Sequence, residues 1–175
     1  GLVLERIGAT SDEAPRALVD WRRANGLLVL FVSNQCPYVV DWADRFARFE
    51  ALGHERQIGI AIVNSNARRR DSTDAPEAMA SFAAEHLGNL PYLLDEGSRL
   101  ADLLDARRTP EAVLYDADLR EVYRGLIDDH SGPFDAVGQH HLRDAFDGLV
   151  GLGPMPESTA PLGCSVQRPR RSRRP

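Results

Sequence analysis

Apolar residues along the chain alternate between uninterrupted runs and stretches in which they recur every three or four positions. The runs at 27–32 and 58–63 have the length of strands that are covered on both faces, as in a parallel sheet. Helical spacing follows each run, over 37–53 and 76–88, where each helix begins at a proline and is predicted to stop at the glycine that ends the range. The first half of the chain therefore predicts two consecutive strand–helix units.

The second half adds shorter elements. A short strand is predicted at 92–95 and a short helix at 98–106. The apolar period then changes to two, so that 111–116 and 120–127 read as the strands of a hairpin. A last amphipathic helix is predicted at about 139–150.

The element order is thus β-α-β-α-β-α-β-β-α, which predicts an α/β fold. Right-handed crossovers make the early strands parallel, and the hairpin adds an antiparallel edge to a central mixed sheet flanked by helices on both faces. We expect one domain over 1–153, followed by an extended tail over 154–175. The last eight residues, Arg168 to Pro175, are rich in arginine and are expected to be disordered, because they offer no apolar side chain to offset the entropy of ordering.

Composition narrows the class of protein. With 43% hydrophobic and 27% charged residues, the chain is typical of a soluble globular domain, and no apolar run is long enough to cross a bilayer. The net charge is −5 and is more negative without the tail, which argues against a nucleic-acid-binding surface. Nothing at the start resembles a signal peptide, so a cytoplasmic location is expected. No metal-ligand spacing, nucleotide motif or flavin motif is seen, and neither a nucleic acid nor a membrane is expected as a partner.

The candidate chemistry centres on Cys36, which follows the run at 27–32 and precedes Pro37, and which is therefore placed at the N-cap of the first helix. This joint lies at the carboxyl end of a strand, where α/β sheets bind ligands. Thiol–disulfide exchange needs an attacking thiolate and a second thiol that releases the mixed disulfide, and Ser33 can supply neither. Cys164 is either a resolving partner for Cys36 or a surface thiol on a loose tail.

Several short motifs together resemble one known family, the thioredoxin-like redoxins related to alkyl hydroperoxide reductase and thiol-specific antioxidant proteins. The match extends over roughly residues 18 to 166. Its pieces are SNQCPYV (33–39), VNSN (63–66), TPE (109–111), YRGLIDD (123–129) and PLGCSV (161–166). The resemblance implies a thioredoxin-like fold in which Pro110, after Thr109, is a cis-proline beside the active thiol.

The chain departs from that family at the first cysteine of its Cys-x-x-Cys pair, where it has Ser33. Ser33-x-x-Cys36 is instead similar to the hydroxyl residue that peroxiredoxins carry three positions before their reactive cysteine. A helix N-terminus stabilises an anion by only about 0.3–1 kcal/mol, so a dominant thiolate needs an arginine. Arg107 and Arg108, just before Thr109, are the candidate thiolate-stabilising residues.

The sequence leads to two functional hypotheses. The first is a peroxiredoxin-like, antioxidant thiol oxidoreductase that uses Cys36 as its reactive thiol to reduce a peroxide or an oxidised thiol. Its electrons come from an external reductant, thioredoxin or a low-molecular-weight thiol, and it needs no cofactor. The second is a redox-inactive thioredoxin-fold module that holds a protein or peptide in the groove beside Pro110.

Overall fold

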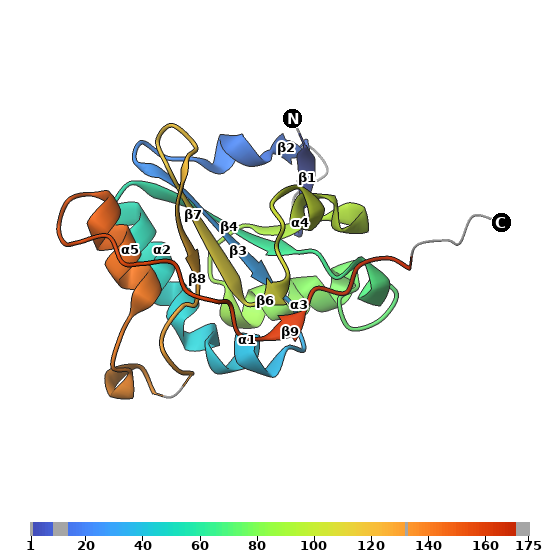
Figure 1. The fold of residues 1–175 in the computed structure, drawn as a ribbon. Coiled ribbons are helices and arrows are strands. Elements are labelled where there is room, and N and C mark those ends of the chain that lie inside the picture. Colours follow the sequence, from blue (N-terminus) through green and yellow to red (C-terminus); the bar gives the residue numbers. More distant parts are fainter. Residues whose placement is uncertain (1, 9–13, 132, 171–175) are drawn as a thin grey trace.

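The computed structural model of the chain describes residues 2–8, 14–131 and 133–170 (Figure 1). Its main feature is a seven-stranded sheet with the strand order β2-β1-β5-β4-β3-β7-β8. The strands of this sheet are β1 (Val3–Arg6), β2 (Arg16–Ala17), β3 (Gly26–Val32), β4 (Ile58–Asn64), β5 (Tyr92–Leu94), β7 (Glu111–Asp116) and β8 (Glu121–Gly125). A separate two-stranded sheet pairs β6 (Arg108–Thr109) with β9 (Cys164–Ser165). The α-helices are α1 (Pro37–Asp41), α2 (Phe46–Glu55), α3 (Pro76–His86), α4 (Arg99–Leu103) and α5 (His141–Leu149).

The strand directions agree with the prediction of a mixed sheet. β3 is parallel to β4 and β4 is parallel to β5, whereas β7 runs antiparallel to both β3 and β8. β1 and β2, which the sequence pattern did not predict, extend the sheet beyond β5 by antiparallel pairing.

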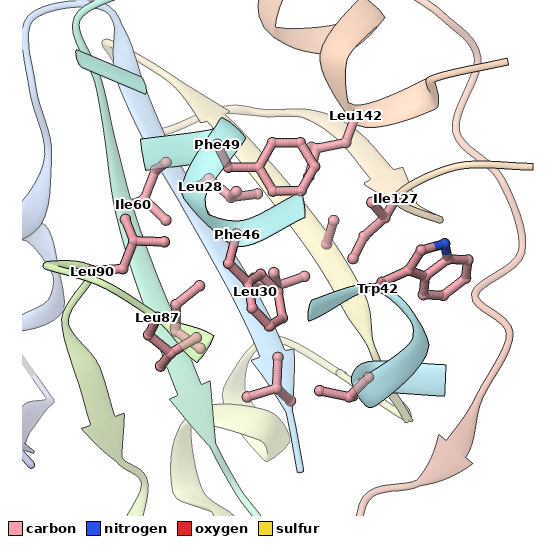
Figure 2. Close-up of a cluster of buried hydrophobic side chains, with 14 of the residues drawn as sticks. Leu28, Leu30, Trp42, Phe46, Phe49, Ile60, Leu87, Leu90, Ile127 and Leu142 are labelled. Atoms are coloured by element: carbon pink, nitrogen blue, oxygen red, sulfur yellow. The ribbon is translucent and has the colours of Figure 1, made fainter. Parts of the chain in front are cut away.

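The core divides between the two faces of the sheet because successive residues of a strand point to opposite sides. In β3, Leu28 and Leu30 pack with α2, α3 and α5, whereas Val29 and Phe31 pack with α4. Figure 2 shows the larger cluster, in which Phe46 of α2 lies over the sheet. All seven residues of β3 and all seven of β4 are buried, as expected for strands covered on both faces.

The helix predicted over 37–53 is two helices, α1 and α2, with a break at Trp42. At the break, Trp42 Nε1 donates a hydrogen bond to the carbonyl oxygen of His130 at 3.1 Å, and Arg45 forms a buried ion pair with Asp128. These tertiary contacts override the local helical pattern. The predicted stop at Gly53 is also wrong: a Cβ there would lie 2.7 Å from Ile60 Cδ1, so the glycine permits close packing on β4 while α2 continues to Glu55.

The segment after α5 crosses the domain and is attached to it (Figure 1). Thr159 N donates to Arg124 O at 2.9 Å, and Val166 is buried in the same cluster as Leu100 and Ala101 of α4. Arg168, which we expected to be disordered, donates to Ala106 O at 2.7 Å and pairs with Asp102, because its guanidinium reaches acceptors in α4 and just beyond it. The expectation is wrong for Arg168, and 171–175 lie outside the described residues.

Among the described residues, no helix has the length and apolar character that a membrane span requires.

Candidate functional site

Cys36 lies where β3 passes into α1. It is the N-cap of α1, as predicted, and Pro37 occupies the first helical position. Its side chain is buried, and its Sγ donates a hydrogen bond to the carbonyl oxygen of Thr109 at 2.8 Å. The peptide bond between Thr109 and Pro110 is cis. The residues singled out at 36, 109 and 110 therefore lie together at one end of the sheet.

Cys164 is brought to the same place by β9. In the register of the β6–β9 pair, Cys164 lies opposite Thr109, whose carbonyl group accepts the bond from Cys36. The Cys164 thiol is partly exposed, lines the same pocket as Cys36 and interacts electrostatically with it. The interpretation of Cys164 as a surface thiol on a loose tail is therefore wrong.

The surroundings of Cys164 change its acidity. Burial and the proximity of Cys36 raise the pKa of Cys164 to about 11, while the nearby Arg108 opposes the increase. Cys164 therefore keeps its proton at neutral pH.

Close approach of β9 to β6 depends on Gly163. Its φ is +153°, and a Cβ at this position would lie 2.1 Å from the Thr109 carbonyl oxygen. Beyond the cysteine, Val166 N donates to Arg107 O at 3.0 Å and continues the pairing. A residue without a side chain at position 163 is thus what allows Cys164 to reach Cys36.

A pocket of about 210 Å³ opens beside the two thiols. Ser33, the residue in place of a first cysteine, contributes to its wall, and its hydroxyl group cannot take the role of a thiolate. The pocket is lined by Ser33, Gln35, Cys36, Asn66, Arg69, Thr73, Asp74, Cys164, Ser165 and Gln167.

The two arginines predicted to stabilise a thiolate are placed differently from each other. The Arg107 guanidinium is exposed and pairs with Asp105 at 2.9 Å, so it does not line the pocket. The Arg108 guanidinium donates to Ser165 Oγ at 3.0 Å, and its charge acts on Cys164. Among the described residues, Arg69 is the arginine that lines the pocket, and no sequence pattern pointed to it.

A buried polar network, also not predicted, supports the loop that carries Cys36. Asp74 is 1% exposed and accepts hydrogen bonds from Asn34 N at 3.0 Å and from Asn64 Nδ2 at 2.6 Å. The Tyr92 hydroxyl group donates to Asn34 Oδ1 at 2.7 Å, and burial raises the pKa of Tyr92. Local sequence offers no signal for this role of Asp74, because Asn34 and Asn64 lie 40 and 10 positions away along the chain.

The Thr109 hydroxyl group is buried and has no hydrogen-bond partner among the described residues. No group of three or more His, Cys, Asp or Glu side chains in the described part of the chain could hold a metal ion. The nucleophilic side chains that line the pocket together are the thiols of Cys36 and Cys164.

No protein-family model matches the chain, and no curated protein matches it. Among solved structures, a protein from Geobacillus kaustophilus described as an uncharacterized conserved protein shares 29% identity over 96% of this chain and 88% of its own, with a TM-score of 0.84. A secreted disulfide oxidoreductase from Mycobacterium tuberculosis is similar at 16% identity over 86% of this chain and 94% of its own, with a TM-score of 0.59.

A thioredoxin-like protein from Aeropyrum pernix shares 20% identity over 71% of this chain and 80% of its own, with a TM-score of 0.55. At these identities the likeness to the last two structures is one of fold. The mixed seven-stranded sheet and its flanking helices show that the chain has a thioredoxin-like fold.

Proposed function

We propose that this protein is a thiol–disulfide oxidoreductase whose reactive pair is Cys36 and Cys164. The observation that carries the proposal is the position of Cys164: its pairing opposite Thr109 in the β6–β9 sheet brings it to the pocket that Cys36 lines. Position 33 cannot supply a sulfur, and Cys164 provides a second one from the other end of the chain. The description of one structural neighbour as a disulfide oxidoreductase is in keeping with this function.

In the reductive half of the cycle, Cys36 at the N-cap of α1 loses its proton and attacks one sulfur of a substrate disulfide as a thiolate. A mixed disulfide forms, and the leaving thiolate takes up a proton. Cys164 then loses its proton and attacks Cys36 Sγ, so that the second substrate thiol leaves and a Cys36–Cys164 disulfide remains. The substrate gains two electrons, and the protein loses two.

An external thiol, either thioredoxin or a low-molecular-weight thiol, then reduces the Cys36–Cys164 disulfide and is itself oxidised. A peroxide enters the same cycle: Cys36 becomes a sulfenic acid as the O–O bond breaks, and Cys164 condenses with it to release water. Both routes belong to the chemistry of the redoxin family that the motifs resemble. In both, Cys164 has the resolving role.

Trapping of the intermediate tests the order of attack. Reduced Cys164→Ser, mixed with an excess of a small disulfide such as bis(2-hydroxyethyl) disulfide, is expected to stop at a mixed disulfide on Cys36. Cys36→Ser is expected to form an adduct on Cys164 more slowly than Cys164→Ser forms one on Cys36, because Cys164 retains its proton. Peptide mass mapping identifies the modified cysteine.

Two results would overturn the proposal. If Cys164→Ser reduces hydrogen peroxide at the rate of the unmodified chain with the same reductant, Cys36 acts alone as a peroxidase. If Cys36 forms no adduct with either oxidant, the redox-inactive binding module takes the place of the oxidoreductase.

A further inference from the structure

The pocket beside the two thiols is small and polar. Apart from the cysteines, it is lined by hydroxyl, amide and charged side chains and by no large apolar one. Ligand pockets more often exceed about 300 Å³ and are mostly apolar. The site therefore fits a small, polar molecule, or the small end of one, rather than an apolar side chain.

The pocket has two charged side chains among its lining residues, Arg69 and Asp74. Both carboxylate oxygens of Asp74 already accept hydrogen bonds, Oδ1 from Asn34 N and Oδ2 from the Thr73 hydroxyl group, and the side chain is 1% exposed. Arg69 is exposed, and its guanidinium makes no ion pair with any described residue. The charge that the pocket offers to a ligand is thus the positive charge of Arg69.

The backbone of Arg69 is joined to the segment that carries Cys164. It ends a 3-10 turn (η3, Ala67–Arg69) in which its backbone N–H bonds Asn66 O at 2.8 Å. That turn is joined to the strand of Cys164 by two bonds: Gln167 N donates to Asn66 Oδ1 at 2.8 Å, and Arg68 N donates to Gln167 O at 2.9 Å. A group bound to Arg69 is therefore positioned by the same segment that carries the second thiol.

We propose that this pocket selects small disulfides whose thiol halves carry a carboxylate, and that Arg69 binds that carboxylate while the disulfide sulfur meets Cys36. The inference rests on the proposed function and adds the substrate class to it. A guanidinium presents two parallel N–H donors that match a carboxylate in geometry and charge, so Arg69 is the specificity-determining residue.

The overall charge of the protein opposes this preference for an anionic disulfide. The net charge is −5, so at long range a cationic disulfide is attracted and an anionic one is repelled. Salt screens such long-range effects beyond about 8 Å at physiological ionic strength. A preference for an anion at that ionic strength therefore reports the local arginine and not the whole molecule.

The test compares three small disulfides: 3,3′-dithiodipropionate with carboxylates, cystamine with ammonium groups, and bis(2-hydroxyethyl) disulfide without charge. The rate constant for oxidation of the fully reduced protein is measured with each and is divided by the rate constant of N-acetylcysteine with the same disulfide. Arg69→Ala is compared with the unmodified chain. Arg143→Ala, which removes an exposed arginine of α5 outside the pocket, controls for net charge.

We expect the unmodified chain and Arg143→Ala to favour the anionic disulfide. Arg69→Ala is expected to lose about tenfold with that disulfide, the scale of one charge-assisted hydrogen bond, and to keep its rate with the neutral one. An equal loss with all three disulfides, or no loss with the anionic one, would overturn the role of Arg69. If the unmodified chain is oxidised by none of the three, the proposed function itself fails.

Discussion

Replacement of Gly163 by alanine is expected to separate the two thiols without changing either of them. The added Cβ would lie 2.1 Å from the Thr109 carbonyl oxygen, 2.8 Å from its carbonyl carbon and 3.2 Å from Pro110 N. Because a Cβ essentially never lies within 3.0 Å of such an atom, the two backbones must move apart by at least 3.0 − 2.1 = 0.9 Å. The atoms that clash are backbone atoms, so no side-chain rotation relieves the contact.

This displacement is large compared with the tolerance of a disulfide. The Cβ–Cβ distance of a disulfide varies over only about 1 Å, between roughly 3.5 and 4.5 Å. Overpacking of this kind costs about 1–3 kcal/mol, and about 1.4 kcal/mol corresponds to a factor of ten in an equilibrium constant. We therefore expect the equilibrium constant for the Cys36–Cys164 disulfide to decrease at least about fivefold.

Titration against mixtures of reduced and oxidised dithiothreitol, with alkylation of the remaining thiols and mass spectrometry, gives that constant. Gly153→Ala is the matched control, since Gly153 lies in the same C-terminal segment and a Cβ there meets no atom within 4 Å. An unchanged constant in Gly163→Ala would show that the close approach of β9 to β6 does not determine whether the thiols react.

Three further predictions concern groups around the pair. The alkylation rate of Cys164 is expected to rise with pH, with a midpoint near 11. Cys36→Ala is expected to lower that midpoint, although burial keeps it above the ordinary value for a thiol. A midpoint that does not move would show that Cys36 does not act on Cys164. Thr109→Val removes a buried hydroxyl group that has no partner among the described residues, so the free energy of unfolding is expected to rise by about 1 kcal/mol in urea titrations, and a decrease would show that the hydroxyl group is bonded. Asp74→Ala leaves Asn34 N and the Asn64 amide without their acceptor and is expected to cost about 2–5 kcal/mol by the same titration, whereas a loss below 1 kcal/mol would refute the role of this network.

The parts of the structure that local pattern determines were predicted well. The apolar run at 27–32 became the buried centre of β3, and the order Cys36-Pro37 correctly marked the start of a helix. Gly88, with φ +57°, follows α3 as predicted. Each of these signals is confined to a few neighbouring residues, and for that reason one sequence is enough to read it.

The site depends instead on contacts between distant residues. β6 and β9 are two residues long, too short for any period, and their pairing joins positions more than fifty residues apart. Gly163 permits that pairing, but its close approach to Thr109 is visible only in three dimensions. The choice between Arg107 and Arg69 likewise depends on which guanidinium faces the pocket, which spacing in the sequence does not reveal.

The central claim, that Cys36 and Cys164 are one reactive pair, is tested most directly by peptide mapping of the oxidised protein without reduction. The reduced chain is treated with one equivalent of bis(2-hydroxyethyl) disulfide, quenched with acid and digested. The peptides are then identified by mass spectrometry. We expect a cross-linked peptide that contains both cysteines, with the mass of two hydrogens lost and no substrate adduct retained. An oxidised protein in which Cys164 alone carries the substrate thiol, while Cys36 remains a free thiol, would contradict it.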